Sequence, residues 1–136
     1  MAKFTIVGLD KLEADIARRA SLLDDAAPEM LKAGTDVLVE YQRGAIIAHE
    51  LVESGDLFDS IKAGPLHHDQ DGYYQEVWPQ GRDHKGVSNA EKGFIHEYGS
   101  SKHAATNWMS EAAEGGEEDV VDAMRKVWNE YAERTE

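Results

Sequence analysis

The sequence predicts an α+β domain in which a small antiparallel β-sheet or hairpin packs on a long helix, with further helices at the N- and C-terminal ends. Three features support this class: helical spacing of apolar residues before residue 52, an alternating pattern around an Asp-Gly turn near residue 71, and a return to helical spacing in the last third. The chain has 136 residues, of which 41% are hydrophobic. We therefore expect one core and a single domain spanning residues 1–136.

The N-terminal part predicts two helices separated by a break. Residues 3–7 form a short β-prone run, and apolar residues then recur every three or four positions up to Leu23. Residues 24–28 interrupt this spacing, and Pro28 suits the first turn of a new helix, where its missing N–H costs nothing. The second helix has an apolar stripe that consists of Leu31, Gly34, Leu38, Tyr41, Ala45, Ala48 and Val52. This stripe predicts about seven turns.

The middle of the chain predicts a β-hairpin. Residues 61–68 and 73–79 alternate as strands do, and the segment between them carries the Asp-Gly pair typical of a tight turn. Two strands alone are marginal in water, so we expect them to pack on the long helix or to join residues 3–7. The polar, glycine-containing residues 80–89 predict a mobile loop.

The last third predicts mainly helices. Residues 90–98 fit either a strand or a short helix, and residues 99–102 predict a turn. A short helix over residues 107–113 is expected to end at Gly115-Gly116. A final helix then carries acids in its first turn, where the helix dipole favours them, and an apolar face. That face consists of Val121, Met124, Trp128 and Tyr131.

The charge balance limits the classes of partner. There are 14 basic and 27 acidic residues, which gives a formal net charge of -13 and repels nucleic-acid phosphates. We therefore expect no sequence-specific nucleic-acid binding. The acids concentrate after residue 110, where the simplest interpretation is a solvated helix face. Without an apolar run long enough to cross a membrane and without a signal peptide, the chain is expected to be soluble and cytosolic when made.

Candidate catalytic and metal sites are weak. The chain has no cysteine and six histidines, of which His67 and His68 lie beside Asp69 and Asp71. Adjacent residues of a strand point to opposite faces, so these two histidines are not expected to bind one ion. His96 and Glu97, with His103, could form an acid–base pair, but no nucleophile or phosphate-binding loop accompanies them. We expect no catalytic residue, cofactor or metal, and we expect the tryptophans to anchor the core or an interface.

Two segments together resemble a known family. Residues 53–61, ESGDLFDSI, and residues 93–109, GFIHEYGSSKHAATNWM, are similar in order and spacing to two elements of the gene-ten-like minor tail and tail-completion proteins of tailed bacteriophages. The matching positions are Gly55, Leu57, Ser60, Ile61, Glu97, Tyr98, Gly99, Ser100, Ala105, Trp108 and Met109. The chain departs from the family pattern at Gly93-Phe94, at Ser100 and at Asn107-Trp108, where the family usually has Tyr-Ala, Thr and Pro-Phe.

Local chemistry gives these elements a physical basis. Ser54 could cap a short helix, Gly55 frees the backbone to turn, and Leu57 and Ile61 are spaced to share a helix face. Gly99 permits a positive-φ turn, which leaves Glu97 to bind nearby backbone N–H groups or a neighbouring subunit.

The resemblance implies a non-catalytic structural role in the virion. The implied protein forms a homo-oligomeric ring at the neck or the top of the tail, as either a tail-completion or a tail-terminator component. This ring contacts the head–tail connector and tail tube proteins. An acidic ring would not grip passing DNA. The long second helix and the final helix, with Trp128 and Tyr131, are the candidate interface. The alternative is a phage-encoded soluble interaction module, an inhibitor or adaptor, that binds a host protein.

Overall fold

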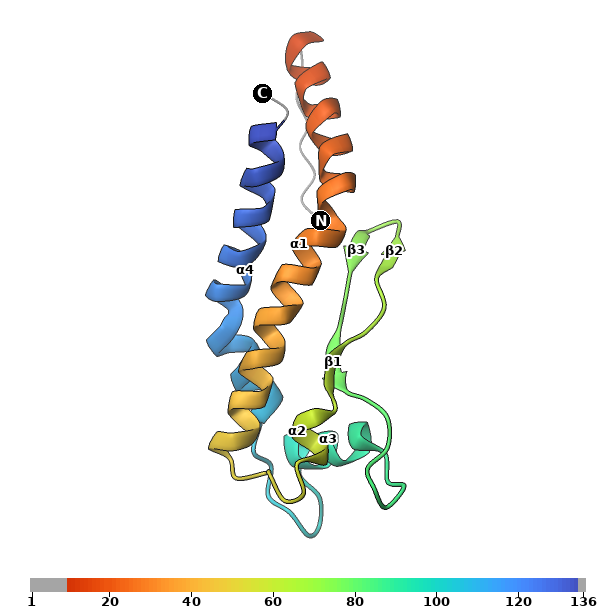
Figure 1. Ribbon diagram of the computed structural model, residues 1–136, viewed down its shortest axis with the longest axis vertical. Coiled ribbons are helices and arrows are strands. Elements are labelled where there is room, and N and C mark those ends of the chain that lie inside the picture. Colours follow the sequence, from red (N-terminus) through yellow and green to blue (C-terminus); the bar gives the residue numbers. More distant parts are fainter. Residues whose placement is uncertain (1–9, 135–136) are drawn as a thin grey trace.

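The computed structural model describes residues 10–134, with side chains from residue 17, and the β-prone residues 3–7 lie outside this range. Two long helices, α1 (Asp10–Ala48) and α4 (Trp108–Arg134), pack side by side along the length of the molecule (Figure 1). The strands and the short helices α2 (Asp56–Asp59) and α3 (Asn89–Tyr98) connect them in sequence. The predicted α+β class is confirmed.

The predicted break before Pro28 is wrong, because α1 runs without interruption through this proline. A proline inside a helix removes one backbone hydrogen bond and commonly costs about 3 kcal/mol. Ala26 and Ala27, which directly precede it, are fully or almost fully buried, while Pro28 itself is exposed. Tertiary packing on one side of the helix therefore outweighs the local preference for a break. The helix ends at Ala48, so Val52 lies outside it and is 47% exposed.

The predicted hairpin is confirmed, but it is divided into two short ladders. Strands β1 (Ile61–Ala63) and β4 (Val77–Pro79) form the inner antiparallel pair, and β2 (His67–Asp69) and β3 (Gly72–Tyr74) form the outer one. The outer pair closes through a two-residue turn in which Asp69 Oδ1 accepts a hydrogen bond from the Asp71 N–H (2.8 Å). The hairpin extends along α1 (Figure 1).

Polar side chains of α1 fix the inner pair against the helix. Gln42 donates to the Val77 carbonyl (3.1 Å), and Arg43 donates to the carbonyls of Phe58 and Ile61 (3.3 Å each). Gln42 is only 3% exposed. The bonds to Val77 and Ile61 supply partners for carbonyls of the inner strands, and the bond to Phe58 does so for a carbonyl of α2, as buried carbonyls require.

The predicted helix end at Gly115-Gly116 is also wrong, because α4 continues through both glycines. A Cβ at Gly116 would lie 2.9 Å from Cγ of Tyr41, so the missing side chain allows α1 and α4 to approach closely. The Tyr41 hydroxyl donates to Asp119 on the next turn of α4. The glycine pair thus serves helix packing and not helix termination.

The predicted apolar face of α4 is correct in part. Met124, Trp128 and Tyr131 are partly buried, but Val121 is 43% exposed. The buried face of α4 begins instead with Trp108, Ala112 and Gly116. These residues recur every four positions, which is the spacing of one helix face.

The core lies at the end of the molecule that holds the short helices. It is formed by Ile46 from α1, Leu57 from α2, Ile61 and Val77 from the inner strands, and Trp108 from α4. Each of the five side chains comes from a different element, and Ile46 and Trp108 have no exposed surface. This cluster joins α2, β1 and β4 to the two-helix body.

The Gly115-Gly116 pair allows a matched test of the packing. Gly116→Ala should lower the free energy of unfolding by about 1–3 kcal/mol, because the added methyl group collides with the Tyr41 ring. Gly115→Ala is the control: its Cβ would lie 4.0 Å from the same ring, an ordinary contact, so the helix preference of alanine should stabilise the protein by up to about 1 kcal/mol. Urea unfolding of both variants measures the two values, and equal effects would contradict this packing.

Candidate functional site

A buried carboxylate connects α3 to the start of α4. Glu97 is 3% exposed, and its oxygens accept hydrogen bonds from the Met109 N–H (2.8 Å), the Ser110 N–H (3.1 Å) and the Ser110 hydroxyl. These N–H groups lie in the first turn of α4, where helical N–H groups have no partner within the helix and the dipole favours negative charge. We call this arrangement the Glu97 clasp. Of the two partners predicted for Glu97, the backbone N–H groups are confirmed.

A glycine turn brings the two sides of the clasp together. Gly99 has φ 82°, and a Cβ there would lie 2.9 Å from the Ala105 nitrogen and 3.1 Å from the His103 carbonyl oxygen. The predicted positive-φ turn is therefore confirmed. The Ser100 hydroxyl accepts hydrogen bonds from the N–H groups of Lys102 and His103 (3.2 Å each), which closes the turn.

Trp108 anchors the same junction in the core. Its ring has no exposed surface, and its Nε1 donates to the Gly93 carbonyl (2.9 Å). A Cβ at Gly93 would lie 2.8 Å from Pro79 Cγ and 3.2 Å from Trp108 Cζ2. Gly93 thus allows α3, β4 and α4 to meet around one indole ring, and Met109 packs beside it. The prediction that this tryptophan anchors the core is correct.

The first family-like element lies beside this core. Gly55 has φ 85° and is itself the N-cap of α2, so the prediction that Ser54 is the cap is wrong, although its hydroxyl accepts a weak bond from the Asp56 N–H (3.4 Å). Leu57 and Ile61 are both buried, but Ile61 begins β1 and does not share a helix face with Leu57. The Ser60 hydroxyl donates to the Leu57 carbonyl (2.6 Å) and closes the helix end.

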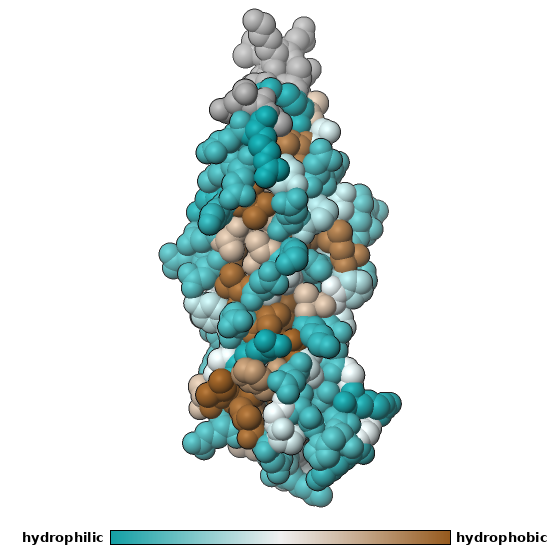
Figure 2. Space-filling model, in the orientation of Figure 1, coloured by the Kyte–Doolittle hydropathy of each residue, from teal (hydrophilic) through white to brown (hydrophobic). Residues whose placement is uncertain are grey.

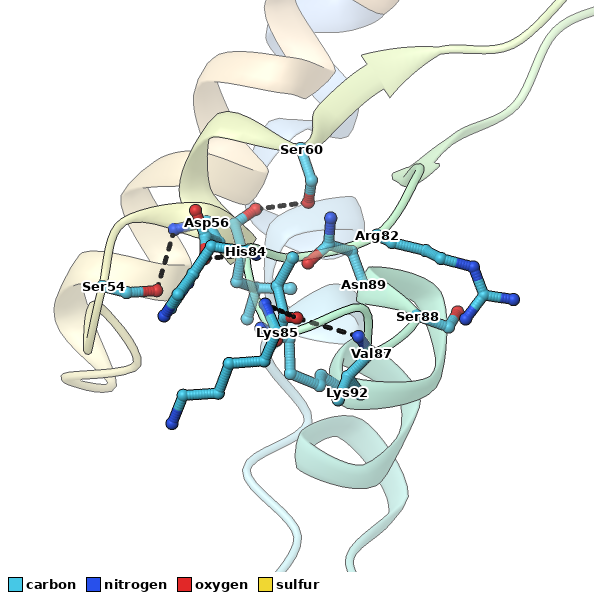
Figure 3. A network of polar contacts seen from close by, with 12 residues as sticks. Ser54, Asp56, Ser60, Arg82, His84, Lys85, Val87, Ser88, Asn89 and Lys92 are labelled. Carbon is cyan, nitrogen blue, oxygen red and sulfur yellow. Dashed lines mark hydrogen bonds and ion pairs between the residues drawn. The ribbon is translucent and has the colours of Figure 1, made fainter.

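The loop over residues 80–89 is held by hydrogen bonds at several points, in contrast to the mobile loop expected. Asp83 accepts hydrogen bonds from the N–H groups of Lys85 (2.9 Å) and Val87 (2.8 Å) and forms an ion pair with Lys92 (2.8 Å) (Figure 3). The Lys92 bond and then the backbone bonds lower the pKa of Asp83 from 3.8 to about 2. The loop is thereby tied to α3, which begins with Ser88 as its N-cap.

A second contact ties this loop to α2. The backbone N–H of His84 donates to Asp56 Oδ2 (3.2 Å), and the His84 ring contacts the same oxygen (Figure 3). This side-chain bond, followed by the backbone bond, lowers the pKa of Asp56. The two family-like elements are therefore linked through the loop as well as through the core.

His67 and His68 do not form a metal site with other side chains in the part of the chain that the structure describes. His67 stacks on Tyr74 and His68 on Tyr73, with ring centroids 4.8 and 3.9 Å apart, so the adjacent histidines use different cross-strand partners. In the described part of the chain, no group of three or more His, Cys, Asp or Glu side chains is arranged to hold a metal ion. These different partners are consistent with the expectation that adjacent residues of a strand point to opposite faces.

The acid–base pair considered from the sequence, for which no catalytic role was expected, does not bring Glu97 to a histidine. The rings of His96 and His103 lie 5.8 Å apart, whereas the Glu97 oxygens bind the start of α4. Partial burial, and then the neighbouring His103 and Lys92, lower the pKa of His96. Glu97 is thus committed to a structural contact and does not orient a histidine.

Trp128 and Tyr131, the candidate interface residues, lie partly buried on α4 and contact α1 of the same chain. The Tyr131 hydroxyl donates to Glu29 (2.6 Å), which raises the pKa of the tyrosine. Trp128 lines a cavity with Leu22 and Asp25 of α1. Contact with a neighbouring subunit through these two residues stays a prediction.

Among the side chains that the structure describes, the most exposed tyrosine, phenylalanine or tryptophan lies beside the clasp. Tyr98 is 75% exposed, and Phe94, one turn earlier on α3, is 43% exposed, with ring centroids 6.2 Å apart. We call Phe94 and Tyr98 the aromatic patch. Phe94 was not singled out from the sequence, although its position four residues before Tyr98 places both rings on one helix face.

Comparisons with protein-family models, with curated proteins and with solved structures find no match to this chain. No helix within residues 10–134 has the length and apolar content needed to span a membrane. Functional inference therefore depends on the residues and their geometry.

The Glu97 clasp can be tested by a change of charge. Glu97→Gln should lower the free energy of unfolding by about 1.5–3 kcal/mol, because the buried bonds to α4 lose their charge and one oxygen acceptor. Glu91→Gln on the exposed face of the same helix is the control and should change it by less than about 0.5 kcal/mol. Thermal and urea unfolding measure both, and a neutral Glu97→Gln would exclude a role for the clasp in stability.

Asp83 gives the loop an acid-sensitive contribution to stability. Because the folded-state pKa is about 2 and the ordinary value is 3.8, the ionised carboxylate stabilises the fold above about pH 4, and this contribution is lost as the pH falls toward 2. Asp83→Asn, which retains an oxygen acceptor but not the charge, should show a smaller decrease in stability over this range. Parallel pH dependences for the wild type and the variant would refute the assignment.

Proposed function

We propose that this chain is a non-catalytic structural component of a phage virion at the head–tail junction, as a tail-completion, neck or tail-terminator ring protein. The observation that carries the proposal is the meeting of the two family-like elements in one core. Leu57 and Ile61 of the first element pack in the same cluster as Trp108 of the second, and Met109 packs against that cluster. Positions about fifty residues apart thus form one structural unit, as expected if both belong to one conserved architecture.

The surface charge is compatible with a channel that DNA must pass. Between Glu111 and Asp122, α4 carries six acidic residues and no lysine or arginine, and all six are exposed. A surface of this kind repels phosphates and releases no counterions, so it would not hold DNA during passage. This face of α4 is our candidate for the inner surface of the ring.

The aromatic patch also supports a second candidate, a phage-encoded inhibitor or adaptor that binds a host protein. A tyrosine that is 75% exposed is a suitable anchor for any protein partner. The two candidates differ in where the protein resides: the first predicts a fixed number of copies in the particle, and the second predicts a protein absent from it.

Deletion of the gene from the phage that encodes it separates these candidates. We expect filled heads and tails that do not join, or tails of abnormal length, by negative-stain microscopy, together with peptides of this chain in purified wild-type particles by mass spectrometry. Complementation with the wild-type gene should restore joined particles. Normal particles from the deletion strain, with no peptide of this chain in the wild-type virion, would contradict the structural role and favour the adaptor.

A further inference from the structure

An open groove lies between the C-terminal part of α1 and the first turns of α4. Its volume is about 430 Å³, and its lining includes Glu40, Tyr41, Gly44, Ala45, Ala48 and Glu111. Small side chains form most of its α1 side, and two carboxylates lie at its rim. We call this the Gly44 groove.

Gly44 differs from the other glycines at helix contacts. Cβ atoms at Gly34 and Gly116 would meet Met124 at 3.0 Å and Tyr41 at 2.9 Å, so packing within the chain requires both glycines. A Cβ at Gly44 would meet nothing within 4 Å. A glycine in a helix interior costs about 1 kcal/mol relative to alanine. No contact within the described chain explains why position 44 is a glycine. A side chain of another molecule lying over Gly44 would explain it.

The aromatic patch lies beside an exposed lysine, whereas the groove has an acidic rim. Lys102 and His103 are exposed in the turn that follows Tyr98, and the nearest acid in sequence, Glu97, is buried in the clasp. The exposed Glu91, one turn before Phe94, is an acid on this side of α3. The groove rim is acidic: Glu40 and Glu111 lie at its edges, although Glu111 accepts a bond from His49 (2.6 Å).

The acidic character of the groove continues along α4. A neighbouring depression is lined by Glu114, Glu117, Glu118 and Asp122, with the exposed Val121 among them. Apolar surface is also present on this side of the molecule: an apolar cluster covers the C-terminal end of α1 (Figure 2), and Ile47, beside the groove residues, is 59% exposed. An aromatic anchor beside the exposed Lys102 thus has an acidic and partly apolar acceptor surface on the same chain.

We propose that the aromatic patch of one copy docks in the Gly44 groove of a second copy, with Tyr98 over Gly44 and with Lys102 and His103 facing the acidic rim. This inference rests on the proposed function only in assigning the contact to the virion ring. Because patch and groove are different surfaces, the contact is heterologous, and repeating it by rotation closes a ring. Buried aromatic side chains surrounded by charge complementarity give such a contact both affinity and register.

Cysteine cross-linking tests the contact, because the natural chain has no cysteine. Ala48→Cys, on the groove lining of one tagged copy, and Ser101→Cys, in the exposed turn after Tyr98 of a differently tagged copy, leave Tyr98 and Gly44 intact, and the two copies are mixed at high concentration under mild oxidation. We expect a mixed disulfide dimer in at least about tenfold excess over the product of Ala48→Cys with Glu130→Cys, an exposed position elsewhere on α4, because correct docking raises the effective concentration of the two thiols. Equal yields, or predominant cross-links between two copies of Ser101→Cys, would overturn the heterologous contact.

Substitutions in the groove supply a matched second test. Gly44→Leu fills the groove without meeting any atom of its own chain near the Cβ, so thermal stability should be maintained or raised. Self-association, followed by analytical ultracentrifugation, should weaken at least about tenfold in both Gly44→Leu and Tyr98→Ala. Unchanged association in both variants would refute the proposal.

The outcomes also separate this contact from the proposed function. Selective cross-linking of a protein that is absent from virions would keep the contact and exclude the head–tail role. Presence in virions without selective cross-linking would overturn the contact and support the head–tail role. Association that requires another protein of the particle, and that Tyr98→Ala weakens but Gly44→Leu does not, would overturn the contact and assign the aromatic patch to that partner.

Discussion

The contact between Glu97 and the start of α4 determines how the two halves of the chain combine. The carboxylate is buried and meets no cation, so its charge is balanced by the N–H groups and the dipole of α4. This balance requires the chain to reverse between α3 and α4 within a few residues. Gly99 at φ 82° makes the reversal possible. The same reversal leaves Tyr98, the neighbour of a buried carboxylate, facing solvent.

Close approaches to glycine determine the rest of the packing. Trp108 lies against Gly93, Trp78 against Gly64, and Tyr41 against Gly116, and in each case an added Cβ would come within 3.2 Å of the aromatic ring. Large aromatic side chains therefore occupy space that small residues leave open, which gives a short sheet and thin helices a shared core. Among the glycines in the described helices, Gly44 alone has nothing within 4 Å of an added Cβ, which is a reason to expect an external partner.

The class of fold could be predicted from the sequence because periodicity and turn chemistry act locally. The Asp-Gly turn, the helical stripe of α1 and the glycine of the Glu97-Tyr98-Gly99-Ser100 turn each depend on few neighbours. The two errors about helix ends have one cause. Pro28 and Gly115-Gly116 oppose a helix locally, but Ala26 and Tyr41 favour it through contacts distant in sequence. Local rules contain no information on such contacts.

The candidate site shows the same limit. The sequence indicated that Glu97 needs backbone partners, but only the folded chain reveals that these belong to Met109 and Ser110 of α4. Pairing of Phe94 with Tyr98 follows from helical spacing and could have been predicted once residues 89–98 were known to be helical. The Gly44 groove could not have been predicted from the sequence, because it depends on where α4 crosses α1.

The central claim is that copies of this chain form a ring at the head–tail junction. Cryo-electron microscopy of purified virions is the decisive test of this claim. The density of the neck is assigned to protein chains without assuming in advance which proteins are present. The account predicts a ring between the head connector and the tail tube whose subunits show two long packed helices with a hairpin beside them, and with the acidic face of α4 toward the channel. A neck in which every density is assigned to other chains would contradict it.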